Sequence, residues 1–130
     1  LLNYRGARPI WIDGAHNSHS ATALAASLAK ITGEKWTLIA GMLKTRKPDD
    51  IFLPLKNLIS EIFTITIPDQ VASLSAQELS ENCQGLGIKA TAKSSLIEAL
   101  SATSKSEFVV ICGSLYLAGH ALLLNNTLPE

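Results

Sequence analysis

Three short segments hold most of the side chains in this sequence that could bind or react with a small molecule. Each is polar or rich in glycine, and each follows a run of apolar residues typical of a buried strand; the segments cover residues 13–19, 41–47 and 113–116. In open parallel sheets, ligands bind outside the carboxyl ends of the strands. We therefore expect a binding site where the three segments meet, provided that their strands converge in the sheet.

The first segment, Asp-Gly-Ala-His-Asn-Ser-His, offers the widest range of polar groups. A carboxylate at a strand end, here Asp13, can accept two hydroxyl hydrogen bonds, which suits a ribose. His16 and Asn17 could donate hydrogen bonds to an anion beside the amino end of the following helix, where negative charge is favoured. In the alternative interpretation, Asp13 and Asn17 only cap that helix. A metal site made of Asp13, His16 and His19 is disfavoured, because no further ligand lies nearby in the sequence.

The second and third segments could bind anions. Lys44, Arg46 and Lys47 place three positive charges within four residues, either facing a phosphate or solvated on a loop. In the third segment, Gly113 allows another backbone to approach closely, and Ser114 can cap the following helix or bind an anion at its amino end. The spacing favours the cap for Ser114.

Short apolar or β-branched runs alternate with amphipathic stretches along the whole chain. The patterns predict strands over 9–13, 36–41, 61–67 and 108–112, a short strand near 88–91, and helices over about 20–32, from 48 to near 54, from 75, from 95 to about 103, and from 114. Strands that alternate with helices indicate βαβ units. We therefore predict one α/β domain over residues 1–130, with a Rossmann-like, mostly parallel sheet covered by helices on both faces.

Composition excludes several classes of partner. The chain has 130 residues with 11 basic and 11 acidic side chains, so its net charge of zero provides no general attraction to nucleic acid or to an anionic membrane. Its apolar runs are shorter than the roughly 18 residues that span a bilayer. The two cysteines, Cys83 and Cys112, are too few for a disulfide framework and are expected to be buried free thiols in a reducing compartment such as the cytoplasm.

The three segments also resemble the motifs of one enzyme family. Residues 12–17, Ile-Asp-Gly-Ala-His-Asn, are similar to the DGAHN signature of folylpolyglutamate synthases, including the bacterial enzymes that double as dihydrofolate synthases. Residues 41–43, Gly-Met-Leu, resemble the start of the family's next loop, and residues 111–119 resemble its GSLYLAG segment near the carboxyl terminus. The three motifs occur in the family's order and with similar spacing, so the resemblance covers essentially the whole chain.

This resemblance implies the C-terminal domain of a Mur-type, ATP-dependent amide ligase. Such enzymes phosphorylate a carboxylate of dihydropteroate or folate, and the amine of L-glutamate then attacks the acyl phosphate. The family's P-loop, Mg²⁺ and folate sites lie mainly in a larger N-terminal domain, and this chain has no GxxxxGK[ST] motif. The resemblance therefore implies a monomeric enzyme that needs its own N-terminal domain, so the isolated 130 residues are expected to be inactive.

The resemblance also implies roles for particular residues. Asp13 matches the aspartate at the ATP ribose, and His16 and Ser114 match positions that bind the incoming glutamate, with Asn17 beside them. Arg46 replaces the lysine of the family's lysine–acid pair and is expected to bind ATP. None of these residues is expected to be a nucleophile or a metal ligand, so their roles would be to position the reactants.

Some residues depart from the family pattern. Ser18 replaces the proline that commonly follows DGAHN, and Lys47 replaces the acid of the lysine–acid pair. Two alternatives to the ligase remain at this point. One is a stand-alone Rossmann-like nucleotide-binding module without catalysis, and the other is an amino-acid ligase domain from elsewhere in the Mur superfamily.

Overall fold

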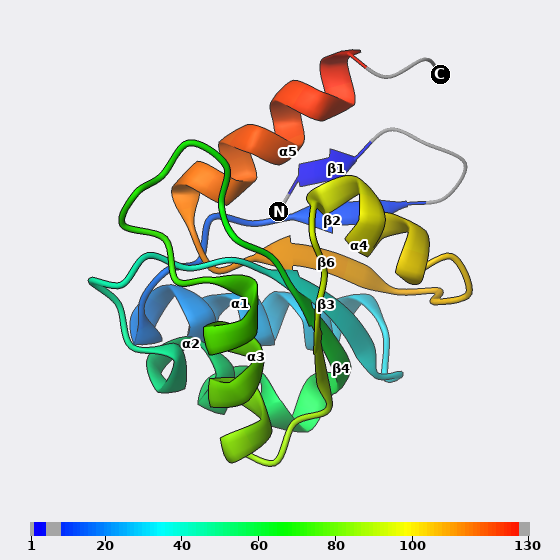
Figure 1. The fold of residues 1–130 in the computed structure, drawn as a ribbon. Helices are drawn as coiled ribbons and strands as arrows, with labels where there is room; N and C mark the ends of the chain where they lie inside the picture. The colour runs from blue at the N-terminus through cyan, green and yellow to red at the C-terminus, as the bar shows by residue number, and fades with distance from the viewer. Residues whose placement is uncertain (1, 5–8, 128–130) are drawn as a thin grey trace.

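The computed structural model of the chain describes residues 2–4 and 9–127 (Figure 1). In chain order the elements are β1 (Leu2–Tyr4), β2 (Ile10–Ile12), α1 (Ser18–Ile31), β3 (Trp36–Ala40), α2 (Pro48–Leu55), the 3-10 turn η1 (Lys56–Leu58), β4 (Ile59–Thr64), α3 (Ala76–Gly85), β5 (Ala90–Ala92), α4 (Leu96–Ala102), β6 (Val109–Cys112) and α5 (Leu115–Thr127). The strands form one sheet in the order β1-β2-β6-β3-β4-β5. All neighbouring strands are parallel except β1, which pairs antiparallel with β2.

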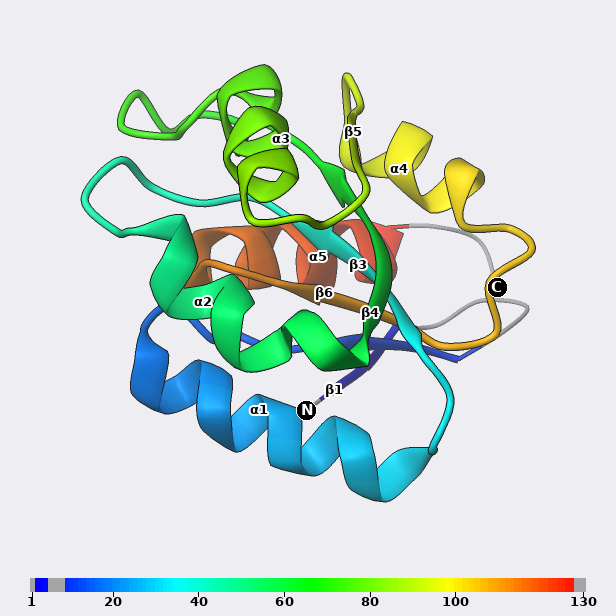
Figure 2. The same cartoon turned by 90° about the horizontal axis from the view of Figure 1, so that it is seen from below.

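Helices cover both faces of this sheet, as predicted. One core cluster joins α1, α2 and α3 to one face, and a second joins α4 and α5 to the other face. Figure 2, seen from below, shows α2 in front of β6 and α5 behind it, so these two helices lie on opposite faces of the sheet. The central strand β3 is buried along its whole length, because its side chains alternate between the two cores: Leu38 belongs to the first and Ile39 to the second.

The predicted fold class is confirmed, and most differences concern the ends of elements. The helix from Pro48 ends at Leu55, one residue beyond Pro54, and gives way to the 3-10 turn η1; Pro54 cannot donate a hydrogen bond to the carbonyl of Asp50, which weakens the last turn of the helix. The strand predicted over 61–67 is β4, which begins earlier, at Ile59, and ends earlier, at Thr64. The apolar pattern continues past this ladder because Ile65 and Ile67 are buried beyond the end of the strand.

Strand β1 was not predicted. It has three residues at the edge of the sheet, which is too short for a period-two pattern to stand out. Among the described residues, no helix combines the length and the apolar character needed to cross a membrane.

Candidate functional site

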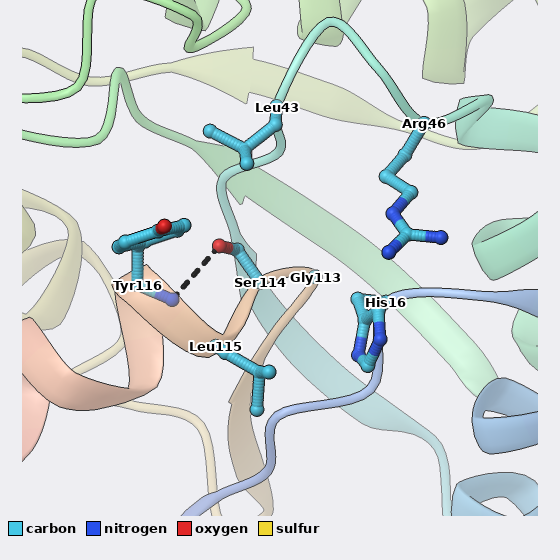
Figure 3. A pocket seen from close by; sticks show the side chains of 7 residues that line it. All are labelled: His16, Leu43, Arg46, Gly113, Ser114, Leu115 and Tyr116. Carbon is cyan, nitrogen blue, oxygen red and sulfur yellow. Dashed lines mark hydrogen bonds between the residues drawn. The ribbon is translucent and has the colours of Figure 1, made fainter.

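Three adjacent strands bring the chemically promising segments together. Strands β2, β6 and β3 are neighbours in the sheet, so the loops that leave their carboxyl ends meet at one edge, as the sequence predicts for converging strands. A pocket opens there, which we call the carboxyl-edge pocket (Figure 3). Its lining residues are His16, Leu43, Arg46, Gly113, Ser114, Leu115 and Tyr116.

Backbone contacts hold the loops tightly against one another. The N–H of Asp13 donates to the carbonyl oxygen of Ile111 (2.9 Å), and the N–H of Gly113 donates to that of Ala15 (3.0 Å). Gly113 has a φ of 113°, and a Cβ atom at this position would lie 2.6 Å from the carbonyl oxygen of Gly41. No side chain fits between these backbones, so the close approach that was predicted for Gly113 is confirmed.

Asp13 shapes the first loop but does not line the carboxyl-edge pocket. Its Oδ1 atom accepts a hydrogen bond from the N–H of Ala15 (2.9 Å), which turns the chain just after β2. The carboxyl group is half-buried. A carboxylate has about four acceptor positions in all, so it can take part in several hydrogen bonds at once.

Asn17 is the N-cap of α1, which confirms the capping interpretation for this residue. Its Oδ1 accepts from the N–H of Ser20 (2.8 Å), and the Ser20 hydroxyl oxygen accepts in return from the N–H of Asn17 (3.2 Å). The Asn17 side-chain oxygen is thus used inside the protein. Asn17 also does not line the carboxyl-edge pocket.

The His16 ring is held in a defined orientation. Its Nδ1 lies 2.9 Å from the carbonyl oxygen of Gly14. Because a carbonyl oxygen can only accept, Nδ1 carries the hydrogen in this bond. The backbone N–H of His16 donates to the Ser20 hydroxyl oxygen (3.0 Å), which holds the main chain as well. The Nε2 atom is left to interact with a ligand, as acceptor in the neutral ring or as donor in the charged ring.

Ser114 caps α5, as the spacing predicts, and also faces the pocket. Its Oγ accepts from the N–H of Tyr116 (3.0 Å; Figure 3), and its side chain is only 3% exposed. A serine hydroxyl has one hydrogen to donate, which this bond does not use. Ser114 can therefore cap the helix and donate to an anion at the same time.

The electrostatics of this edge favour an anionic ligand. Helices α1 and α5 both begin here, and the amino end of a helix carries a partial positive charge. Arg46 adds a full positive charge, and Figure 3 shows its guanidinium pointing toward His16. Lys44, Arg46 and Lys47 are all exposed, but Arg46 lines the pocket and the two lysines do not.

Leu43, Leu115 and Tyr116 add an apolar side to the pocket that sequence reasoning did not assign to the site. Leu115 and Tyr116 are 63% and 54% exposed, which is unusual for such large side chains. Their position in the third segment, directly after Ser114, was the available signal. The pocket measures about 80 Å³, whereas pockets that enclose a ligand measure roughly 300–1,000 Å³. The carboxyl-edge pocket is therefore too small to enclose a ligand by itself.

The described residues do not offer a metal site. No three His, Cys, Asp or Glu side chains in the described part of the chain are close enough together to hold an ion. Cys112 lies at the end of β6, near Asp13, and is fully buried. Burial, and then the negative charge of Asp13, raise the pKa of its thiol well above the ordinary range. This thiol is therefore protonated at neutral pH in the folded chain, which makes it a poor nucleophile.

Comparison with known proteins identifies relatives of this fold and sequence. Residues 3–124 match the sequence model of the family described as dihydrofolate synthetase, C-terminal domain. Comparison with curated protein sequences found no significant match.

Among solved structures, Mycobacterium tuberculosis folylpolyglutamate synthase complexed with ADP superposes with a TM-score of 0.86 at 20% identity, covering 100% of this chain and 32% of that one. E. coli FolC in complex with DHPP and ADP gives 0.82 at 19% identity, covering 97% and 30%. The bifunctional folylpolyglutamate synthase/dihydrofolate synthase of Yersinia pestis, complexed with AMPPNP and Mn ion, gives 0.81 at 22%, covering 96% and 30%. The chain thus spans about a third of the length of the proteins whose fold it shares.

Proposed function

Because the chain belongs to the family of dihydrofolate synthetase C-terminal domains, we propose that it is the C-terminal domain of an ATP-dependent ligase. The complete enzyme would join L-glutamate to dihydropteroate or to folate through an acyl phosphate. The observation that carries this proposal is the convergence of His16, Arg46 and Ser114 in one open, positively charged pocket beside two helix amino ends.

In this proposal the pocket binds the incoming glutamate. The Ser114 hydroxyl hydrogen would be donated to a glutamate carboxylate at the amino end of α5, where negative charge is favoured. The Nε2 atom of His16 would accept from the glutamate ammonium group in the neutral ring, or donate to a carboxylate in the charged ring. The bond from Nδ1 to Gly14 supports this role because it holds the ring before the ligand arrives. A structure similar in fold, a bifunctional folylpolyglutamate synthase/dihydrofolate synthase, was solved with Mn, AMPPNP and L-glutamate bound.

The nucleotide would lie along the adjoining part of the same edge. Asp13 would accept hydrogen bonds from the ribose hydroxyls, a role that suits a carboxylate at the end of a strand. Arg46 would face the phosphate groups, close to the place where the acyl phosphate meets the amine. In this proposal the P-loop, the folate site and the ligands of Mg²⁺ come from a larger N-terminal domain.

The contribution of this domain would be to position the reactants. Holding two reactants in a reactive geometry can remove about 7–11 kcal/mol from a barrier without any covalent role for the protein. The small volume and open shape of the carboxyl-edge pocket support this view, because a second domain has to close over it to exclude water. Closure would also bring the amine and the acyl phosphate together.

The direct test is a glutamate-incorporation assay with the full-length protein that contains this chain. We expect ATP-dependent incorporation into dihydropteroate or folate, with one ADP released per glutamate, and no incorporation by the isolated 130 residues. A full-length protein that binds nucleotide without incorporating glutamate would support the binding-module alternative. Incorporation by the isolated 130 residues would contradict the assignment of the phosphate and folate sites to another domain.

Substitutions in the full-length protein test the two halves of the site separately. Asp13→Ala is expected to raise the KM for ATP about tenfold or more, as is typical when a hydrogen bond to a charged group is lost. His16→Ala is expected to raise the KM for glutamate instead. Asp13→Asn is the matched control for the turn, since it keeps an oxygen for the Ala15 N–H. If Asp13→Ala lowers the melting temperature and leaves the ATP KM unchanged, Asp13 serves only the loop.

A further inference from the structure

The loop that carries Arg46 is held by a second loop that does not reach the carboxyl-edge pocket. This second loop, residues 65–75, leaves the end of β4 and runs beside the 41–47 loop (Figure 2). The N–H of Lys44 donates to the carbonyl oxygen of Ala72 (2.7 Å), and the N–H of Leu74 donates to that of Met42 (2.8 Å). The two loops are therefore joined like a short antiparallel ribbon.

Ser73 lies at the centre of this ribbon. It is 6% exposed and forms an isolated β-bridge with Leu43. Its Oγ accepts from the N–H of Ile67 (2.9 Å) and donates to the carbonyl oxygen of Leu74 (2.8 Å), with that of Met42 at 3.4 Å as a second acceptor. The hydroxyl thus connects both ends of the 65–75 loop and fixes the backbone that pairs with the 41–47 loop.

The contacts lead from Ser73 to Arg46 in two steps. Ser73 is bridged to Leu43, and the N–H of Arg46 donates to the carbonyl oxygen of Leu43 (3.1 Å). Arg46 itself is exposed, and a long side chain on an unsupported loop would lose much conformational freedom on binding a ligand. A backbone that is already held in place reduces this entropic cost.

We propose that Ser73 is a positioning residue for Arg46, and that the 65–75 loop sets where the guanidinium meets the anionic ligand. The loop contributes no lining residue to the carboxyl-edge pocket, so its effect on binding must pass through the 41–47 loop. This inference rests on the proposed function, in which Arg46 contacts a phosphate or carboxylate of a substrate.

A double-mutant cycle in the full-length protein tests the coupling. Ser73→Ala is expected to raise the KM of the same substrate that Arg46→Ala affects, about threefold to tenfold, while kcat stays within about twofold. In the double variant the effect of Ser73→Ala on this KM should disappear, because the group that it positions is already missing. Ser80→Ala is the matched control: this serine in α3 is also buried, and its Oγ accepts a hydrogen bond from the Gln84 side chain away from the pocket.

The outcomes separate the inference from the proposed function. Independent, additive effects of Ser73→Ala and Arg46→Ala on the KM, or a KM for Ser73→Ala equal to that of Ser80→Ala, would overturn the role of Ser73. A wild-type protein without ligase activity would instead defeat the proposed function, and the inference with it. If Ser73→Ala does not fold, Ser73→Cys retains a weak donor and acceptor; it should give a smaller rise in the same KM, and unchanged KM values would again overturn the role.

Discussion

The amino ends and the carboxyl ends of the parallel strands, here the amino edge and the carboxyl edge of the sheet, are held together in different ways. At the amino edge, aromatic side chains fill the space: Trp11 and Trp36 meet edge to face with centroids 5.2 Å apart, and Phe108 packs 5.5 Å from Trp36. At the carboxyl edge, two backbones pack directly against each other. A Cβ atom on Gly113 would clash with the carbonyl oxygen of Gly41. The first edge is held together by side chains and the second by backbone groups.

This difference explains how one small domain can combine stability with an open site. Trp36 is fully buried and contributes to the core formed with α1, α2 and α3. At the carboxyl edge the large apolar side chains of Leu115 and Tyr116 are exposed, and polar groups end the strands. We infer that side-chain packing contributes more to the free energy of folding at the amino edge than at the carboxyl edge.

The largest effect should follow from removing the centre of the aromatic cluster. Trp36→Ala is expected to lower the free energy of unfolding by about 3–5 kcal/mol, measured by urea denaturation of the 130-residue chain. Trp36→Phe should cost clearly less. It keeps a ring in the core and removes the indole N–H, which is a buried polar atom without a hydrogen-bond partner among the described residues. Equal costs for the two variants would contradict the importance of ring packing at this edge.

The next largest effect should come from the backbone crossing at the other edge. Gly113→Ala forces an L side chain into a φ of 113° and against the Gly41 carbonyl, so we expect a loss of about 2–3 kcal/mol in unfolding free energy. Gly33→Ala is the matched control, because its Cβ would meet nothing within 4 Å. This control should be neutral or slightly stabilising. A Gly113→Ala variant as stable as Gly33→Ala would show that the loops can separate at little cost.

A smaller effect is expected at the cap of α1. Asn17→Ala removes the acceptor for the Ser20 N–H and should cost about 1 kcal/mol of unfolding free energy. Asn17→Asp keeps an acceptor oxygen and should retain most of the stability. In the full-length protein the same variants test whether Asn17 also binds glutamate. A raised KM for glutamate in Asn17→Ala, measured at a temperature where this variant is fully folded, would assign it both roles.

The smallest effect is expected for the two buried thiols, Cys83 and Cys112, whose reactivity reports whether the core opens. Burial raises the pKa of Cys83 to about 12 and that of Cys112 still further. Neither thiol should react with a disulfide reagent at pH 8 until the chain is unfolded in urea, because the thiolate is the reactive form. The free energy of unfolding should fall as the pH rises above about 8.5, since only the unfolded chain then releases these protons. Rapid reaction of native Cys112 would mean that the core beneath Gly113 opens.

Much of this arrangement could be predicted from local patterns. The helix predicted to begin near 75 starts with a capping box, in which the Ser75 hydroxyl accepts from the Glu78 N–H (3.1 Å) and the Glu78 carboxylate accepts from the Ser75 N–H (3.1 Å). At Ser95 the serine caps α4, but the Glu98 carboxylate accepts from Ser94 instead of returning to the cap. The bond from the backbone N–H to the serine hydroxyl forms in both helices because the two groups are close in the chain. The partner of the glutamate carboxylate depends on which donor lies nearest in space.

The candidate site was predicted less completely than the fold. The position of His16 and Ser114 at strand ends follows from the sequence, but three neighbouring cations, Lys44, Arg46 and Lys47, look alike there. Only the folded loop points Arg46 into the carboxyl-edge pocket. The contribution of Ser73 has no sequence signal, because its partners belong to another loop that is distant in the chain.

The sequence by itself determined which segments become strands and helices, and that the polar segments follow strand ends, since apolar periodicity, glycine and capping residues act on neighbouring backbone groups. The tertiary structure decided that β2, β6 and β3 are adjacent, that Gly113 touches Gly41, and that the 65–75 loop supports the loop of Arg46. These features depend on hydrogen bonds and packing between segments far apart in the chain, which form only when the two cores close on the sheet.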